Sequence, residues 1–224
     1  MKLPYPYTQA GRYKRGRGTH KPEMIVVHWS AGWGDDDAIA DYFVAPKKKK
    51  ALATDGTTKW VPRDASYHFA VGRMGSVTQL VDTDDTAWHS GGGVDWAGRK
   101  DINARSIGVC LANRGPVKAS ELKRLEAAQV YHGKHTKPGF HGYGATFEAY
   151  NFEAMDALRQ LVEQLVRLHP TITGVCGHED LVRGKGDPGP AFNTWNPRWS
   201  DMGLVRHVRD WKSGKWRPWE TAAG

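Results

Sequence analysis

The chain has 224 residues, of which 39% are hydrophobic and 25% are charged. These values are typical of one folded domain with a polar surface, and the length is short for two domains. The formal net charge of +8 favours an anionic partner such as nucleic acid, an anionic membrane surface or a cell-wall polymer, although a merely soluble basic surface has the same composition.

The first part of the chain is predicted to contain an irregular extension, a strand and a helix. Residues 1–22 are basic and poor in aliphatic side chains, which predicts an extension without regular structure. The apolar run 24–29 predicts a buried strand, and Asp35 to Asp37 predict the start of a helix that reaches about Phe43. The run from Lys47 to Lys50 predicts a solvated loop, with contact to an anion as the alternative.

The middle of the chain is predicted to add strands and a second helix. Segments 66–73 and 76–81 predict a pair of strands joined by a glycine-containing turn. The apolar run 106–112 predicts a strand near the centre of a sheet. A helix is predicted over 120–128, because its apolar residues share one face. Residues 132–146 contain glycine and histidine and predict a surface loop.

The last part of the chain is predicted to begin with the longest helix, over about 148–168, where apolar residues recur near helical spacing. The run 172–176 predicts another strand. A final helix is predicted after Asp201, with Val205 and Val208 on its apolar side.

The alternation of strands and helices predicts a single α/β domain, with a central mixed β-sheet flanked by helices. We expect this domain to span 23–212, between the basic N-terminal extension 1–22 and a loose C-terminal tail 213–224. Cys110 and Cys176 each lie in an apolar run, which favours buried, reduced thiols over a disulfide.

The N-terminus lacks the apolar core of a signal peptide, and no apolar run approaches the length of a transmembrane helix. We therefore expect a chain without a transmembrane segment that is cytoplasmic as synthesised.

The most informative segment is the loop 177–190, which is rich in glycine and proline and therefore suits a pinned loop more than a helix or strand. It places His178 and Asp187 nine residues apart. Far upstream, His28 ends the first predicted strand. Two histidines and one carboxylate are a common ligand set for a catalytic zinc ion that keeps one position open to water. Alone, a histidine and an aspartate at this spacing indicate only a surface loop.

The lysine two positions before the carboxylate adds to this pattern. An ammonium group at Lys185 could stabilise the oxyanion that forms when an amide carbonyl is attacked. The alternative is an ordinary salt-bridging lysine on a surface loop.

Five blocks appear in a fixed order, and together they resemble a known family. They are the strand that ends at His28, Ser66-Tyr67-His68-Phe69, Ala87-Trp88-His89-Ser90-Gly91, the strand start after Asn103, and the loop 177–190. This order resembles the type 2 zinc N-acetylmuramoyl-L-alanine amidases, the family of phage T7 lysozyme and AmpD, which is related to the peptidoglycan recognition proteins. The resemblance covers roughly residues 24–192.

The resemblance implies that His28, His178 and Asp187 are the ligands of a Zn²⁺ cofactor. It implies that Tyr67 faces the metal and assists catalysis, and that Lys185 is the family's catalytic lysine. Strand alternation independently puts Tyr67 and its neighbour His68 on opposite faces, so only one of them can face the metal.

Two further residues match positions that line the substrate groove or support it, namely His89 and Asn103. For His89 a structural histidine that is hydrogen-bonded to a loop is the alternative. Aromatic side chains near the matched blocks either stack on sugar rings or pack in the core; they are Trp29, Trp33, Trp88, Trp96 and Trp195. The histidines of the loop 132–146 match no metal site.

The chain departs from the family pattern at Cys110, where many relatives carry a glutamate. A thiol cannot serve as a carboxylate base, although T7-like members lack that glutamate too. Asp187 resembles the third ligand of AmpD-type members, whereas T7-like members use a cysteine there. Cys176 could compete as a soft ligand, but a buried strand position that faces away is the simpler interpretation.

The resemblance implies a zinc-dependent amidase that cleaves the bond between the lactyl group of N-acetylmuramic acid and L-alanine in peptidoglycan. We expect a phage or prophage endolysin, monomeric and without an obligatory nucleic-acid partner, that reaches the cell wall after holin-type release. The alternatives are a cytosolic muropeptide-recycling amidase and a non-catalytic peptidoglycan-binding protein. A basic nucleic-acid-binding protein is a third alternative, which the basic residues of 1–22 keep open.

Overall fold

The computed structural model describes the whole chain except residues 45–47, 53–57, 63–64, 134–145, 196–198 and 220–224. Seven strands form one sheet in the order β11-β10-β9-β1-β6-β4-β5. Strand β1 (Met24–Trp29) pairs in parallel with β6 (Ser106–Leu111) and β9 (Gly174–Gly177). The outer strands are β4 (Phe69–Val71), β5 (Val77–Gln79), β10 (Val205–Arg209) and β11 (Trp216–Pro218).

The sheet is mixed, as the sequence predicts, because β4–β5 and β10–β11 are antiparallel pairs while the other pairs are parallel. Two antiparallel hairpins lie outside it. They are β2 (Lys48–Leu52) with β3 (Thr58–Pro62), and β7 (Val130–His132) with β8 (Thr146–Glu148).

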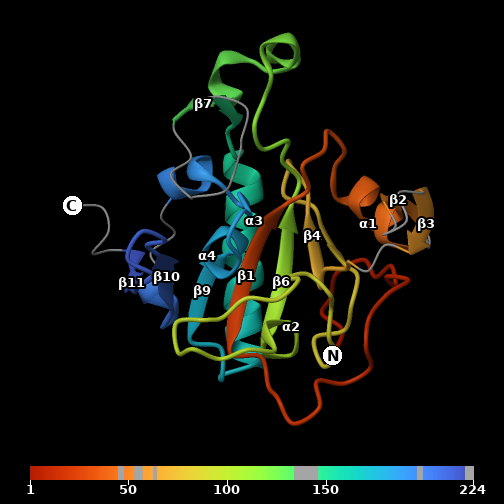
Figure 1. Cartoon of the computed structure of the whole chain (residues 1–224), viewed down its shortest axis with the longest axis vertical. Helices are drawn as coiled ribbons and strands as arrows, with labels where there is room; N and C mark the ends of the chain where they lie inside the picture. The colour runs from red at the N-terminus through yellow and green to blue at the C-terminus, as the bar shows by residue number, and fades with distance from the viewer. Residues whose placement is uncertain (45–47, 53–57, 63–64, 134–145, 196–198, 220–224) are drawn as a thin grey trace.

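One face of the sheet is covered by α3 (Phe152–Leu168), which runs behind β1 and β6 in Figure 1. Its buried residues recur at helical spacing, and they form one core cluster with Ile25 and Val27 of β1. Burying each such aliphatic side chain stabilises the fold by roughly 1.5–3 kcal/mol. The packing of the amphipathic face therefore holds the helix against the sheet. None of the described helices is long and apolar enough to cross a membrane.

The opposite face of the sheet carries the chemistry-bearing residues. Successive side chains of a strand alternate between faces, so Val26 and His28 point away from α3. The helix α1 (Asp36–Val44) packs on this side, where Ile39 joins a second cluster that contains Cys110. His28 and Cys110 lie opposite each other in the β1–β6 register. The loops after β1 and β9 and the helix α1 therefore surround the end of β1 that carries His28.

The predicted final helix is wrong. Val205 and Val208 lie in strand β10, whose burial alternates along the chain, and only a short 3₁₀ helix, η4 (Trp199–Met202), precedes it. The amide of Val205 donates to the carbonyl of Thr173 at 3.0 Å, next to the start of β9. An open sheet edge thus decides the structure over a helical spacing of only two valines. The C-terminal tail that we expected to be loose contains β11, which pairs with β10.

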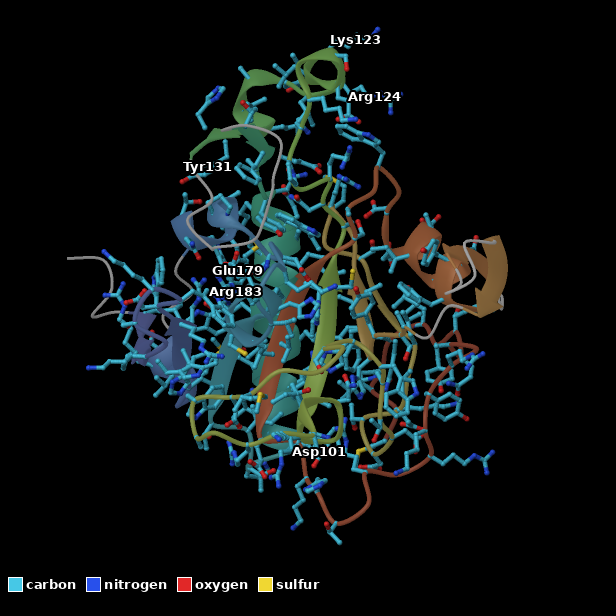
Figure 2. All side chains as sticks on the ribbon, viewed as in Figure 1. Asp101, Lys123, Arg124, Tyr131, Glu179 and Arg183 are labelled. Atoms are coloured by element: carbon cyan, nitrogen blue, oxygen red, sulfur yellow. The ribbon has the colours of Figure 1, made fainter. Side chains whose placement is uncertain are left out.

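The helix predicted over 120–128 is also wrong. The chain forms two 3₁₀ turns there, η1 (Ala119–Arg124) and η2 (Ala127–Gln129), and neither has a buried residue. Figure 2 shows Lys123 and Arg124 at the tip of a lobe that projects beyond the sheet. Without an apolar surface to pack against, the apolar side of such a segment gains nothing from forming a regular helix.

Two smaller differences concern the edges of predicted elements. Of the predicted loop from Lys47 to Lys50, Lys48 to Lys50 belong to strand β2, and Lys47 lies outside the described residues. The long helix begins at Phe152 rather than 148, because Thr146 to Glu148 pair with β7 as strand β8.

Residues 1–22 are largely irregular, as predicted, but they are bound tightly to the domain. The amide of Ala10 donates to Leu80 at 2.8 Å, and Lys14 forms a bridge with Thr86. The guanidinium of Arg17 is buried and donates from Nε to the carbonyl of Thr83 at 2.7 Å and from Nη1 to that of Ser106 at 3.0 Å. The segment therefore covers the β5 edge of the sheet.

Candidate metal centre and active site

Three side chains converge where two parallel strands end. His28 lies near the carboxyl end of β1, and His178 follows β9 directly as the first residue of α4 (His178–Leu181). Asp187 lies in the loop after α4. Because β1 and β9 are parallel neighbours, their carboxyl ends meet at the same edge of the sheet. The topology therefore brings His28 next to Asp187, although the two residues are 159 positions apart in the sequence.

The geometry of the three side chains is that of a ligand cluster. Nδ1 of His28 lies 2.8 Å from Oδ2 of Asp187, and Nδ1 of His178 lies 3.0 Å from the same oxygen. One ligand atom from each residue lies within 4.8 Å of the others. Two imidazole nitrogens and a carboxylate oxygen are a donor set that zinc accepts.

The loop that carries Asp187 is held by its backbone. The amide of Glu179 donates to the carbonyl of Asp187 at 2.8 Å, and the hydroxyl of Tyr150 donates to the carbonyl of Pro188 at 2.9 Å. Gly189 has a φ of +79°, and a Cβ there would lie 2.3 Å from Cζ3 of Trp29. Only glycine therefore fits against the indole at this position, which fixes the path of the loop.

The hydrogen positions of His178 and Asp187 favour a bound cation. Nε2 of His178 lies 2.9 Å from the carbonyl of Ser90, which can only accept, so Nε2 carries the hydrogen. In neutral His178 the lone pair of Nδ1 then faces Asp187. Burial would raise the pKa of Asp187, but its interactions with His178 and His28, including a hydrogen bond to each, outweigh that effect and hold the pKa below its usual value. An acceptor nitrogen and an ionised carboxylate at hydrogen-bond distance repel each other, and a divalent metal ion between them removes this repulsion, so these residues fit a divalent metal.

Burial also controls the charge of the histidines. It lowers the pKa of His28 to about 4, and the proximity of His178 and Lys185 lowers the pKa further, against the opposing effect of Asp187. Burial lowers the pKa of His89 well below its usual value. Both imidazoles are therefore neutral near pH 7, the form in which a histidine can act as a metal ligand or as a hydrogen-bond acceptor.

Tyr67 lies beside the ligand cluster. Its ring centroid is 4.9 Å from that of His28, and Phe43 of α1 packs edge-on against it at 5.0 Å. Burial raises the pKa of Tyr67 well above its usual value, so its hydroxyl stays protonated and can donate a hydrogen bond. His68 points elsewhere, because its Nδ1 accepts from the amide of Gly108 and its Nε2 contacts Arg17. The structure thus brings Tyr67, and not His68, to the site.

An open cavity of about 760 Å³ lies over the cluster. Its walls come from the loop after β1, from α1 and from the loops that carry the other predicted site residues. The predicted site residues that line it are Tyr67, His89, Asn103, His178 and Lys185. The exposed side chain of Trp88 also contributes to it. The arrangement offers a metal-binding position, a neutral phenol and an exposed ammonium group around one open groove.

Comparison with known proteins identifies the family. The family model for N-acetylmuramoyl-L-alanine amidase matches residues 18–190. The chain belongs to the N-acetylmuramoyl-L-alanine amidase family. The matched range contains all seven predicted site residues of this amidase-family chain.

Individual relatives are similar over different lengths. N-acetylmuramoyl-L-alanine amidase AmiD of Escherichia coli strain K12 is 31% identical over 117 residues, which are 52% of this chain and 34% of AmiD. The chain thus spans about a third of the length of that relative. A crystal structure of a selenomethionine derivative of AmpD has a TM-score of 0.57 at 20% identity, covering 90% of this chain and 94% of that one.

A second solved structure shares the fold. The complex of AmiD from E. coli with the substrate anhydro-N-acetylmuramic acid-L-Ala-D-gamma-Glu-L-Lys has a TM-score of 0.53 at 22% identity. It covers 83% of this chain and 60% of that one. These likenesses show that the mixed sheet with flanking helices is the fold of the amidase family.

His89 and Asn103 support the site of this amidase-family chain as well as lining its groove. Oδ1 of Asn103 accepts from the amides of His89 at 3.0 Å and Ser90 at 2.9 Å. The amide group of Asn103 therefore holds the segment whose carbonyl, at Ser90, contacts His178. These bonds explain why an asparagine stands at this position, and they leave the substrate contact that the resemblance implies untested.

The cysteines do not take part in the ligand cluster. Both are buried and free, as predicted. Cys176 lies opposite Val26 in the β1–β9 register, so it shares the sheet face of His28 instead of facing away. It packs among apolar residues there, outside the group of described residues that can hold a metal. Burial raises the pKa of Cys110 well above its usual value, so this position offers a neutral thiol where many relatives carry a carboxylate.

Sequence reasoning missed three residues that the site depends on. Ser90 and Ser106 lie inside the matched blocks, but nothing in the sequence showed that their oxygen atoms contact histidines. Arg17 looked like part of a solvent-exposed basic arm, whereas it is buried. Of the loop histidines, His132 is exposed in β7, while His135 and His141 lie outside the described residues.

Proposed function

We propose that this chain is a zinc-dependent N-acetylmuramoyl-L-alanine amidase that hydrolyses the amide bond between the lactyl group and L-alanine in peptidoglycan. The observation that carries the proposal is the convergence of His28, His178 and Asp187 beneath an open groove that Tyr67 and Lys185 also line. Family membership supports the reaction type, and the donor set supports zinc.

The residues of the chain would divide the work as follows. A zinc ion, when bound, supplies a Lewis acid that makes water nucleophilic near neutral pH. His28, His178 and Asp187 hold it. The exposed ammonium group of Lys185 stabilises the negative charge that develops on the lactyl carbonyl oxygen. The protonated hydroxyl of Tyr67 donates a hydrogen bond within the same groove and can exchange a proton as the L-alanine amine leaves.

The finer biological setting stays a prediction. An endolysin acts on intact wall, whereas a recycling amidase acts on small soluble muropeptides, and the open groove by itself favours neither substrate. A non-catalytic peptidoglycan-binding protein needs no complete ligand set, so the presence of all three ligands disfavours that alternative.

The test measures newly released N-terminal L-alanine amines from purified sacculi and, separately, from soluble anhydro-muropeptides. We expect release by the zinc-loaded wild type that is lost after chelation and in Asp187→Ala. The control is Asp201→Asn, which removes an exposed carboxylate from η4 and should leave release unchanged. Zinc-loaded, folded protein that releases no amine from either substrate would refute the proposed activity. Release from sacculi supports the endolysin setting, and release from small muropeptides alone supports recycling.

A further inference from the structure

A chain of hydrogen bonds runs from a backbone carbonyl to a predicted metal ligand. Oγ of Ser106 lies 2.5 Å from the carbonyl of Ile102, in α2 (Ile102–Arg105). Nε2 of His89 lies 3.0 Å from the same Oγ. Nδ1 of His89 lies 3.1 Å from Nε2 of His28. Three successive bonds therefore link Ile102 to His28.

The backbone carbonyl of Ile102 determines which atom donates in each of these three hydrogen bonds. A backbone carbonyl can only accept, so the single hydroxyl hydrogen of Ser106 points to Ile102. Oγ of Ser106 then accepts, which places the hydrogen of neutral His89 on Nε2 and leaves Nδ1 as an acceptor. That acceptor requires the hydrogen of His28 to be on Nε2. The Nδ1 atom of His28 is left with its lone pair toward Asp187, where the other ligand atoms meet.

The ring of His89 has no room to take another orientation. His28, Ser106 and His89 are all buried. A Cβ at Gly108 would lie 2.5 Å from Cγ of His89, so the ring packs directly on the backbone of β6. The backbone of His89 is held at its amide by Asn103. The backbone and the side chain of His89 are thus both fixed. A flip of its ring that reverses the direction of the hydrogen bonds would cost free energy.

We propose that His89 and Ser106 are positioning residues that keep His28 in the tautomer whose Nδ1 lone pair faces the metal position. This inference rests on the proposed function only for the identity of the metal. If one of these hydrogen bonds is removed, His28 can carry its hydrogen on Nδ1 and donate it to Asp187, 2.8 Å away. A metal ion must then displace that proton. Partners of this kind typically contribute about 10–100-fold to metal affinity.

The first measurement is the tautomer of His28 in metal-free protein, read from the long-range ¹⁵N–¹H correlations of its ring near pH 7. We expect hydrogen on Nε2 in the wild type and a substantial Nδ1–H population in Ser106→Ala. The matched control is Thr86→Val, which removes another buried hydroxyl that donates to a backbone carbonyl, that of Gly16 at 2.8 Å. Hydrogen on Nδ1 in the wild type would overturn the proposal.

The second measurement is the zinc dissociation constant by competition with a chelator, on variants whose folding is checked by circular dichroism. We expect His89→Leu and Ser106→Ala to bind zinc about 10–100-fold more weakly. His89→Asn should recover much of the affinity, since its side-chain oxygen can replace the Nδ1 acceptor, and Thr86→Val should bind as the wild type does. If His89→Leu does not fold, Ser106→Ala and the tautomer measurement decide the question.

The two proposals fail in different ways. Folded Ser106→Ala with zinc affinity within about twofold of the wild type would overturn the positioning role and leave the amidase activity unaffected. Zinc binding with the expected tautomer but without amide hydrolysis would refute the proposed activity and leave the positioning role standing.

Discussion

The indole of Trp29 is wedged between two glycines, and this contact predicts a sharp effect of Gly189→Ala. A Cβ at Gly189 would lie 2.3 Å from the ring, and a Cβ at Gly115 on another side would lie 2.9 Å from it. Gly115 therefore opposes a movement of Trp29 away from Gly189 on that side. Asp187 lies two residues before Gly189, so any displacement of the loop moves a predicted metal ligand.

The expected cost has two parts. Gly189 has a φ of +79° and a ψ of 177°, a region that is almost exclusive to glycine, and a non-glycine residue there costs about 1–3 kcal/mol. Overpacking against the rigid indole adds roughly 1–3 kcal/mol. We thus expect Gly189→Ala to lower the free energy of unfolding by about 2–6 kcal/mol and to weaken zinc binding as well.

The control for this prediction is Gly203→Ala. Gly203 has a φ of +70°, but a Cβ there would have no atom within 4 Å. This variant should show the cost of a positive φ without overpacking, with unchanged zinc affinity. Urea unfolding of the metal-free proteins measures the first quantity, and chelator competition measures the second. Equal destabilisation by the two substitutions, with normal zinc binding in both, would show that the contact between Gly189 and Trp29 does not position Asp187.

Three further predictions address the arm, the charge of the site and catalysis. Arg17→Met leaves buried carbonyls without their donor and should destabilise the fold by about 3 kcal/mol, whereas Arg15→Met at an exposed position should not. Equal melting temperatures of the two variants would contradict a structural role of residues 1–22. The folded-state pKa of His28, about 4 against 6.5 when unfolded, means that the unfolded chain binds more protons between these values. Metal-free protein should therefore lose up to about 3 kcal/mol of stability as pH falls from 6.5 to 4, and His28→Gln should lose less; identical pH slopes in urea unfolding would count against a neutral His28. Lys185→Ala should lower kcat for amide hydrolysis by roughly 10²–10³-fold with unchanged zinc affinity, and exposed Lys212→Ala should have no effect; a loss confined to KM would assign Lys185 to substrate binding instead.

The elements that sequence patterns predicted well are those whose pattern is long or strongly apolar. Helix α3 repeats its apolar residues over several turns, and β1 and β6 consist mostly of apolar residues, so the local sequence of each element predicts its burial. The predictions for short segments were wrong. The two valines in β10 have helical spacing, but pairing with β9 made this segment a strand. The residues of η1 and η2 have an apolar side but no surface to bury it against.

The sequence by itself determined which chemical groups the site contains. Two histidines and an aspartate are residue types that indicate a zinc site, and the order of the blocks that also contain the tyrosine and the lysine resembles one family, which implies amide chemistry. The structure brings His28, His178 and Asp187 together, as that resemblance implied.

Only the tertiary structure decided how these groups are held. The tautomer of His28 depends on His89 and Ser106, which lie far from it in the chain and reach it through the packing of β1 against β6. The burial of Arg17 likewise depends on carbonyls of a distant segment. Hydrogen-bond direction and burial are properties of neighbours in space, and a linear pattern does not contain them.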